Sequence, residues 1–452
     1  MFFRNHHGHQ KKMHQNIAKC NCLILVMMLG ISILAGAISS VPAFAKEKIT
    51  LRALLVEPSD RWEKTLIPMA LQNLTAKYPE LEIQVNYTIL PYNDAREHML
   101  EAMSNKSNID LISLDQIWLG EFAEKDYLTD LGNYSKAWGR LGDWYESNLD
   151  GAVYKDKIFG IWAWTDVRSI WYWKDLLNKP AIDPNSLKLW DSYIESARKL
   201  NEALNDQGIQ GVELTGGPSS QNEWYPYLWM LGGSIVESKP GHPTEDFYWF
   251  PSYNSSQGVR ALEFLKKLVD VGVKPITANF ETEFASKNFA VMLGGSWLPT
   301  SFPSLTRQDF EQQIGMIPMF PVPNENTATS TMMGGWLLSI PYNSKNKDLT
   351  WKLIETMLEP KILSSMLAEY GYLPTQIPIG EGPYSEKLRK SIPYYDQLIS
   401  LVQFGHARPN IAEYPQIADH IREAIDNVYS GAKEPRQALD NAAAKSAKAL
   451  GW

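Results

Sequence analysis

The feature that most constrains this chain is an alternation of strand and helix signals that begins near residue 49. Apolar residues alternate with others over 49–55 and 83–89, which is the spacing of a half-buried strand. Residues 66–74 and 94–104 have helical periodicity, and 110–114 form a short, mostly apolar strand. Strands that alternate with helices predict an α/β layer on a mostly parallel sheet. Sheets of this kind bind ligands beyond the carboxyl ends of their strands.

Later segments have mostly helical periodicity and no internal repeat. Apolar residues recur at helical spacing in 190–204, 262–269 and 417–428, which predicts three more helices. The chain has 452 residues, enough for two or three domains. Its 44% hydrophobic and 21% charged residues are typical of a folded globular protein.

The first 45 residues have the pattern of a secretory signal peptide. They contain basic residues but no acidic one, then an apolar run over 23–38, then Ala43-Phe44-Ala45. We expect cleavage after Ala45, and therefore a periplasmic or cell-surface protein. The apolar run is shorter than the ~20 residues of a membrane span. An uncleaved N-terminal anchor is the alternative.

Charge and residue usage exclude several function classes. The formal net charge of −8 argues against nucleic-acid binding and against an anionic membrane surface. Both cysteines, Cys20 and Cys22, lie in the predicted signal peptide, so we expect neither disulfides nor a cysteine nucleophile after it. The histidines beyond residue 45 are scattered. We therefore predict no metal site and no cofactor.

Tryptophan is the main chemical signal in the sequence. All 16 tryptophans follow residue 45. Several stand close together or beside glycines: Trp162, Trp164, Trp171, Trp173, Trp224, Trp229, Trp297 and Trp336. A sugar ring has an apolar C–H face and a rim of hydroxyls, which suits flat aromatic faces beside carboxylates and guanidinium groups. Core packing is the alternative for any single tryptophan, whereas the set as a whole favours a carbohydrate site.

A family resemblance appears in the segment KIFGIWAWTDVRSIWYWKDLL, residues 157–177. It is similar to the signature of family 1 extracellular solute-binding proteins of ABC importers, with a glycine at Gly160 and Tyr-x-Lys-Asp-Leu at 172–176. Trp173 departs from the Asn or Asp that the family usually has after the tyrosine. Other landmarks occur in the family's order at 110–122, 223–233, 289–297, 334–341, 372–375 and 408–409.

Within that family the chain most resembles the binding proteins for α-linked di- and oligosaccharides, such as trehalose, maltose, sucrose or glucosylglycerol. The resemblance implies a monomeric protein without catalysis that delivers its sugar to membrane permease subunits. It also implies an α/β, type II-like fold of two lobes with a hinge and an interlobe ligand cleft. By analogy, lobe one comprises 46–155 and 282–335, and lobe two comprises 156–281 and 336–452.

The candidate ligand-binding residues follow strands or glycine-rich turns, or match positions of the family. Asp115 ends a predicted strand at its carboxyl side. Trp297 and Trp336 follow glycines, which permit sharp turns. The resemblance implies ligand contacts for Asp166, Trp224 and Arg408. The full set is Glu57, Asp115, Trp118, Asp166, Trp224, Glu283, Trp297, Gly335, Trp336 and Arg408.

Two other function classes remain open on the sequence. A secreted glycoside hydrolase needs two carboxylates roughly 5–10 Å apart across the scissile bond, and acidic residues are frequent near the aromatic ones. The same fold could instead bind a non-sugar cation such as a polyamine, because tryptophan faces attract cations.

Overall fold

The computed structural model describes residues 46–56, 62–239, 248–277 and 279–452. The predicted signal peptide, residues 1–45, and the candidate Glu57 lie outside the described residues. Within the described part of the chain, no helix combines the length and the hydropathy that a membrane span requires.

The predicted strand–helix alternation is confirmed at the start of the fold. The chain forms β1 (Glu47–Val56), α2 (Ile67–Lys77), β2 (Leu81–Leu90), α3 (Tyr92–Ser104) and β3 (Leu111–Asp115). All five residues of β3 are buried, which explains why it is mostly apolar. β1 and β3 pair in parallel.

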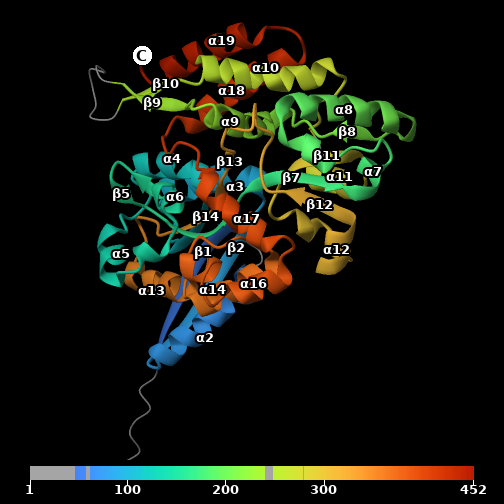
Figure 1. The fold of residues 1–452 in the computed structure, drawn as a ribbon. Coiled ribbons are helices and arrows are strands. Elements are labelled where there is room, and N and C mark those ends of the chain that lie inside the picture. Colours follow the sequence, from blue (N-terminus) through green and yellow to red (C-terminus); the bar gives the residue numbers. More distant parts are fainter. Residues whose placement is uncertain (1–45, 57–61, 240–247, 278) are drawn as a thin grey trace, which may run out of the picture. The chain divides into compact units, whose positions relative to one another are not determined.

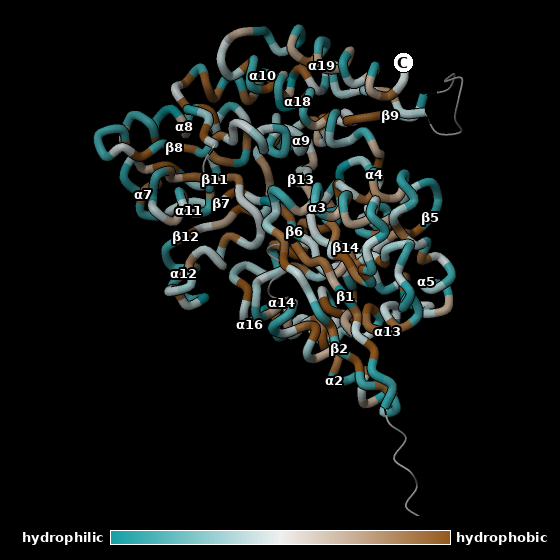
Figure 2. The backbone as a smooth tube through the Cα atoms, turned by 180° about the vertical axis from the view of Figure 1, so that it is seen from behind, coloured by the Kyte–Doolittle hydropathy of each residue, from teal (hydrophilic) through white to brown (hydrophobic). Residues whose placement is uncertain are grey.

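A five-stranded sheet contains these strands and two from later in the sequence. Its order is β2-β1-β3-β14-β6, with β6 at Ile161–Asp166 and β14 at Gly334–Ser339. β14 runs antiparallel to both β3 and β6. Figure 2 shows hydrophobic segments on β1 and β14 in the interior of the fold.

A second, four-stranded sheet has the order β12-β7-β11-β8. Its strands are β7 (Arg168–Trp173), β8 (Gln210–Val212), β11 (Phe289–Gly295) and β12 (Ile314–Ile317). β7 is antiparallel to β11 and β12, whereas β8 is parallel to β11. Only Val167 separates β6 of the first sheet from β7 of the second.

Helices cover both sheets, and the helices predicted from periodicity are present. α13 (Lys347–Met357) packs on α2, and α14 (Pro360–Tyr370) packs close by. α8 (Trp190–Leu204) lies on β8, and α9 (Ser220–Met230) contacts α10 (Ser256–Asp270) and α18 (Tyr414–Tyr429). α19 (Pro435–Ala449) lies along α18, and this helical group is seen in Figure 1. α18 buries Ile417, Ile421, Ala424 and Val428, which share one helical face.

The strands of the two sheets are not distributed along the chain as the expected lobe boundaries would require. β11 and β12, which the expectation placed in lobe one, pair with β7 in the four-stranded sheet. β6, expected in lobe two, belongs to the five-stranded sheet together with β14. The difference arises because segment 157–177 is itself the passage between the sheets, with its midpoint at Val167. We call the two parts the five-stranded lobe and the four-stranded lobe.

Candidate ligand-binding site

The ends of two strands and the start of a third meet at one edge of the five-stranded sheet. Asp115 is the last residue of β3, and Asp166 is the last residue of β6. Because β14 runs antiparallel between these strands, its first residues lie beside their ends: Trp336 pairs with Asp115, and Gly334 pairs with Asp166. The sheet thus brings two carboxylates and an indole to the edge where ligands bind in open α/β sheets.

The four-stranded lobe contributes a cation and a second indole. Arg168, the first residue of β7, pairs with Gly295 at the end of β11. The Arg168 guanidinium lies 2.5 Å from Asp166 Oδ1 and 4.8 Å from the ring centre of Trp297. The Trp297 indole N–H donates to Glu281 Oε1 at 2.8 Å. One continuous chain of contacts therefore runs from Asp166 in one lobe to Glu281 in the other.

Aromatic rings surround the carboxylates. Tyr92 stacks on Trp118 with ring centres 5.5 Å apart, and Trp336 meets both rings edge-on at 6.2 and 6.3 Å. Trp164 stacks on Tyr372 at 4.0 Å. Trp118 and Trp336 are 4% and 5% exposed, whereas Tyr92 is 42% exposed. Tyr92 therefore forms the solvent-facing rim of an otherwise buried aromatic set.

Arg408 joins the same group from the segment that follows β15 (Gly405–His406). Its Nη2 lies 3.6 Å from Asp115 Oδ1, while the Tyr92 hydroxyl donates to Asp115 Oδ2 at 2.9 Å. Burial raises the pKa of the Asp115 carboxyl above its ordinary value, and the Arg408 charge and the Tyr92 hydrogen bond oppose this effect. We call the group of Asp115, Asp166, Arg168, Trp297, Trp336 and Arg408, with its surrounding rings, the interlobe cluster.

The interlobe cluster retains unused hydrogen-bonding capacity. Arg408 Nε, Trp164 Nε1 and Ser296 Oγ are buried and have no hydrogen-bond partner among the described residues. Buried polar groups are almost always paired in native proteins. These three atoms are therefore left without a partner by the described part of the protein itself.

Gly335 is required by the backbone at this edge. Its φ is +140°, and a Cβ there would lie 2.3 Å from the Trp164 carbonyl oxygen. The β14–β6 register shifts at the following Trp336/Leu337 step. Glycine thus permits the close approach that places Trp336 beside Asp115.

We expect Gly335→Ala to destabilise the protein by about 1–3 kcal/mol, because the added methyl group collides with backbone and the φ is unfavourable. Gly142→Ala is the matched control, since Gly142 has no atom within 4 Å of a Cβ position. Urea unfolding of both variants measures the effect. Equal stability of the two variants would contradict the argument.

Two candidates from the sequence lie elsewhere. Trp224 is 0% exposed and packs in α9 against Tyr225 and Tyr253, with ring centres 6.0 and 6.4 Å away, so it is a core residue in this structure. The Glu283 carboxylate accepts a hydrogen bond from Asn288. Glu281, two residues earlier, is the one that reaches Trp297.

Sequence reasoning did not select five residues of the interlobe cluster and its contacts as ligand-binding candidates: Tyr92, Trp164, Arg168, Glu281 and Tyr372. Tyr92 carried a usable signal, because it begins the helix after strand β2 and thus follows a carboxyl strand end. Tyr372 belongs to the family landmark 372–375, but its contact with Trp164 joins residues far apart in the sequence and has no local signal.

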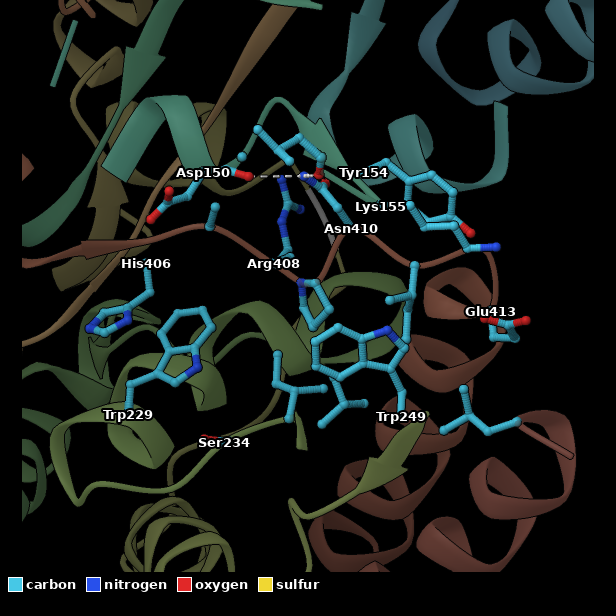
Figure 3. Close-up of a pocket in the computed structure, with 18 of the residues that line it drawn as sticks. Asp150, Tyr154, Lys155, Trp229, Ser234, Trp249, His406, Arg408, Asn410 and Glu413 are labelled. Atoms are coloured by element: carbon cyan, nitrogen blue, oxygen red, sulfur yellow. Dashed lines mark hydrogen bonds between the residues drawn. The ribbon is translucent and has the colours of Figure 1, made fainter. Parts of the chain in front are cut away.

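A separate open cavity of about 1010 Å³ also borders Arg408. Figure 3 shows Trp229 and Trp249 on one side of it and Asp150, Tyr154 and Asn410 on the other. Trp229 lies in the last turn of α9 and stacks on His406, with ring centres 5.1 Å apart. Asn410 Nδ2 donates to the Val153 carbonyl at 3.1 Å, which joins segment 405–411 to the α6–β4 turn (α6, Glu146–Asp150; β4, Val153–Tyr154).

This cavity differs from the interlobe cluster in how it is built. Its lining comes from turns, helix ends and the edge strands β9 (Val236–Ser238) and β10 (Trp249–Pro251), not from carboxyl ends of the main sheets. Trp249 is nevertheless an aromatic residue that a sugar could reach, which makes it a useful control for the interlobe cluster. Within the described residues, no group of three or more His, Cys, Asp or Glu could hold a metal ion.

Comparison with known proteins identifies the class. The model of the bacterial extracellular solute-binding protein family matches residues 60–362, and the chain belongs to this family. A curated relative, described as a binding protein of Brucella abortus (strain 2308), is 23% identical over 381 residues, which cover 80% of this chain and 85% of the relative.

Solved structures share the fold. An ABC transporter solute-binding protein from Thermotoga lettingae, bound to α-D-tagatose, has a TM-score of 0.73 at 23% identity and covers 90% of this chain and 100% of its own. The GacH receptor of Streptomyces glaucescens, solved unliganded and with acarbose, has a TM-score of 0.73 at 22% identity. The match covers 89% of this chain and 99% of the receptor. Maltose-bound MalE3 of T. maritima has a TM-score of 0.71 at 21% identity. The match covers 88% of this chain and 98% of MalE3. The fold is therefore the two-lobe fold of periplasmic binding proteins.

Proposed function

We propose that the protein is the substrate-binding component of an ABC sugar importer. It captures a di- or oligosaccharide of the α-glucoside type outside the cytoplasmic membrane and delivers it to permease subunits. The observation that carries this proposal is the interlobe cluster, which combines aromatic faces with carboxylates and guanidinium groups from both lobes. The structural neighbours bound to tagatose, acarbose and maltose support a sugar as the ligand.

The chemistry of the interlobe cluster suits a sugar better than a cation. Carboxylate oxygens of Asp115 and Asp166 can accept hydrogen bonds from sugar hydroxyls, and the guanidinium groups of Arg168 and Arg408 can donate hydrogen bonds to hydroxyl oxygens. The indoles of Trp297 and Trp336 exclude water from the apolar faces of the ring. Arg168 and Arg408 lie beside Asp166 and Asp115 and neutralise their charges, so the cluster offers a polyamine no unpaired carboxylate and the cation alternative is disfavoured.

Capture involves closure of the lobes. Asp115 is 7% exposed in this arrangement of the lobes, and we expect their separation to give a ligand access to it. A sugar that touches Asp115 in one lobe and Trp297 in the other stabilises the closed arrangement by its differential affinity for it. The segments that join the lobes, at Val167, between β12 and β14, and between β15 and α18, are the proposed hinges.

A thermal-shift panel tests the proposal. Trehalose, maltose, sucrose and glucosylglycerol are each added to the protein, with spermidine as the cation probe. A ligand at 100 times its Kd stabilises the native state by about 2.7 kcal/mol, and the melting temperature rises accordingly. We expect at least one saccharide to raise it and spermidine to leave it unchanged.

Product analysis of the same samples separates binding from hydrolysis. A binding protein releases no monosaccharide on prolonged incubation, whereas a glycoside hydrolase does. Stabilisation by spermidine alone, or release of monosaccharide, would overturn the proposed function.

A further inference from the structure

Two buried glutamates lie side by side in the four-stranded lobe and are bound to one residue. Glu213 directly follows β8, and Glu223 lies in the first turn of α9. They are 1% and 5% exposed. Glu213 Oε1 accepts from the Thr215 hydroxyl at 2.6 Å, and Glu223 Oε2 accepts from the Thr215 backbone N–H at 2.6 Å.

The second oxygen of each carboxyl group has no such partner. Glu213 Oε2 and Glu223 Oε1 are buried and have no hydrogen-bond partner among the described residues. The same is true of three tyrosine hydroxyls from three helices: Tyr193 of α8, Tyr227 of α9 and Tyr429 of α18. The electrostatic influence of both glutamates reaches all three hydroxyls.

The titratable groups that face this pair are tyrosines and one further glutamate. From α8, α9 and α18 they are the three tyrosines, and from α11 (Phe280–Ala285) it is Glu281. In the described part of the chain, no lysine, arginine or histidine forms an ion pair with either glutamate. Two carboxylates buried together without a cation are very unfavourable, so such a pair takes up protons instead.

We propose that Glu213 and Glu223 form a protonated carboxyl pair that fastens the start of α9 to the end of β8 and loosens when the pair ionises. The protonated form leaves no buried charge beside the tyrosine hydroxyls. The ionised form leaves two charges in an interior that has only the Thr215 donors and one backbone N–H from β11 to offset them.

The titration behaviour agrees with this geometry. Burial raises the pKa of Glu213 to about 7, and burial together with the neighbouring Glu213 raises the pKa of Glu223 well above its ordinary value. A carboxyl group in an unfolded chain titrates near pH 4.3. Between that pH and the raised pKa the folded protein holds more protons than the unfolded chain. Stability from this pair is therefore complete below about pH 4 and is lost as the pH rises through the raised pKa values.

The pair also lies next to the interlobe cluster. Glu281, which accepts the indole N–H of Trp297, is the carboxylate whose charge further raises the pKa of Glu213. Ionisation of Glu213 thus places a second negative charge near the Glu281–Trp297 contact. Because linkage is reciprocal, sugar affinity and protonation of the pair influence each other. This coupling rests on the proposed function, whereas the effect of pH on stability does not.

The test uses Glu213→Gln and Glu223→Gln, which keep the size of the protonated acid but cannot ionise. Glu263→Gln, at an exposed position of α10, is the matched control. Urea unfolding is measured from pH 5 to pH 9, which covers most of the interval between the pKa of an unfolded carboxyl group and the raised pKa of Glu213. We expect the wild type and the control to lose stability as the pH rises, by up to tenfold in the unfolding constant per pH unit for each proton released. Each Gln variant at the pair loses less.

Infrared spectroscopy at pH 7 gives a second measurement that needs no stable variant. The wild type shows a protonated carboxylic-acid band that weakens as the pH is raised to 9. No such band, or a pH dependence of unfolding in both Gln variants equal to that of the control, would overturn the proposal.

Titration of trehalose or maltose at pH 6 and pH 9 tests the coupling. Failure of every sugar to bind would count against the proposed function and leave the result on stability intact.

Discussion

Trp297→Ala weakens saccharide binding by about 5- to 150-fold, because one sugar–indole stack contributes ~1–3 kcal/mol by analogy with other rings on aromatic faces. The variant also removes the acceptor face for Arg168 and the donor to Glu281. Trp249→Ala, in the separate open cavity, is the matched control and is expected to keep wild-type affinity. Calorimetric titration with the saccharide that stabilises the protein most measures both.

A melting curve on the same samples separates a binding role from a packing role. A Trp→Ala change in a core lowers stability by ~3–5 kcal/mol and leaves the folded fraction able to bind. A Trp297→Ala variant with much lower stability but unchanged affinity for the saccharide would contradict the stacking role. Loss of affinity in Trp249→Ala instead would move the sugar site to the open cavity.

Arg408→Met is expected to destabilise the protein by about 3–5 kcal/mol at neutral pH, because it leaves the Asp115 carboxylate buried without its cation. Arg408 and Asp115 are 9% and 7% exposed, so solvent cannot replace the lost partner. Without Arg408 the pKa of Asp115, already raised by burial, rises further. The deficit in stability is therefore smaller at low pH, where Asp115 is protonated, and grows as the pH rises.

Urea unfolding at pH 5 and pH 8 measures this effect. Arg436→Met, at an exposed position of α19, is the control and is expected to stay within about 0.5 kcal/mol of the wild type. The double variant Asp115→Asn with Arg408→Met regains part of the lost stability. A deficit that is the same at both pH values, or no recovery in the double variant, would contradict the role of the pair.

Local patterns were sufficient for the secondary structure and for part of the interlobe cluster. Alternation and helical spacing predicted β1, β2, β3 and the helices α2, α3, α8, α10 and α18. Asp115 was predictable because it lies at the carboxyl end of a buried strand. Trp336 was predictable because it follows Gly334 and Gly335, which the backbone requires there.

The corrections have a common physical origin. Glu281 and Glu283 lie in one short helix, and the sequence cannot tell which of them faces Trp297. Trp224 precedes two glycines as a stacking residue would, yet the packing of α9 against α10 and α18 buries it. The lobe boundaries depend on which strands pair, as β14 does with β3 and β6, and pairing between distant segments leaves no local signal. Ligand roles for the cluster residues stay predictions.

Small-angle scattering with and without saccharide tests the central claim most directly, namely that a sugar held between Asp115 and Trp297 keeps the lobes closed. The saccharide that raises the melting temperature most is added at saturation. We predict a smaller radius of gyration in the saturated wild type than in the free protein. At the same sugar concentration Trp297→Ala stays mostly unbound, so its radius of gyration is expected not to change. A radius of gyration that does not change at saturation of the wild type would contradict closure around the ligand.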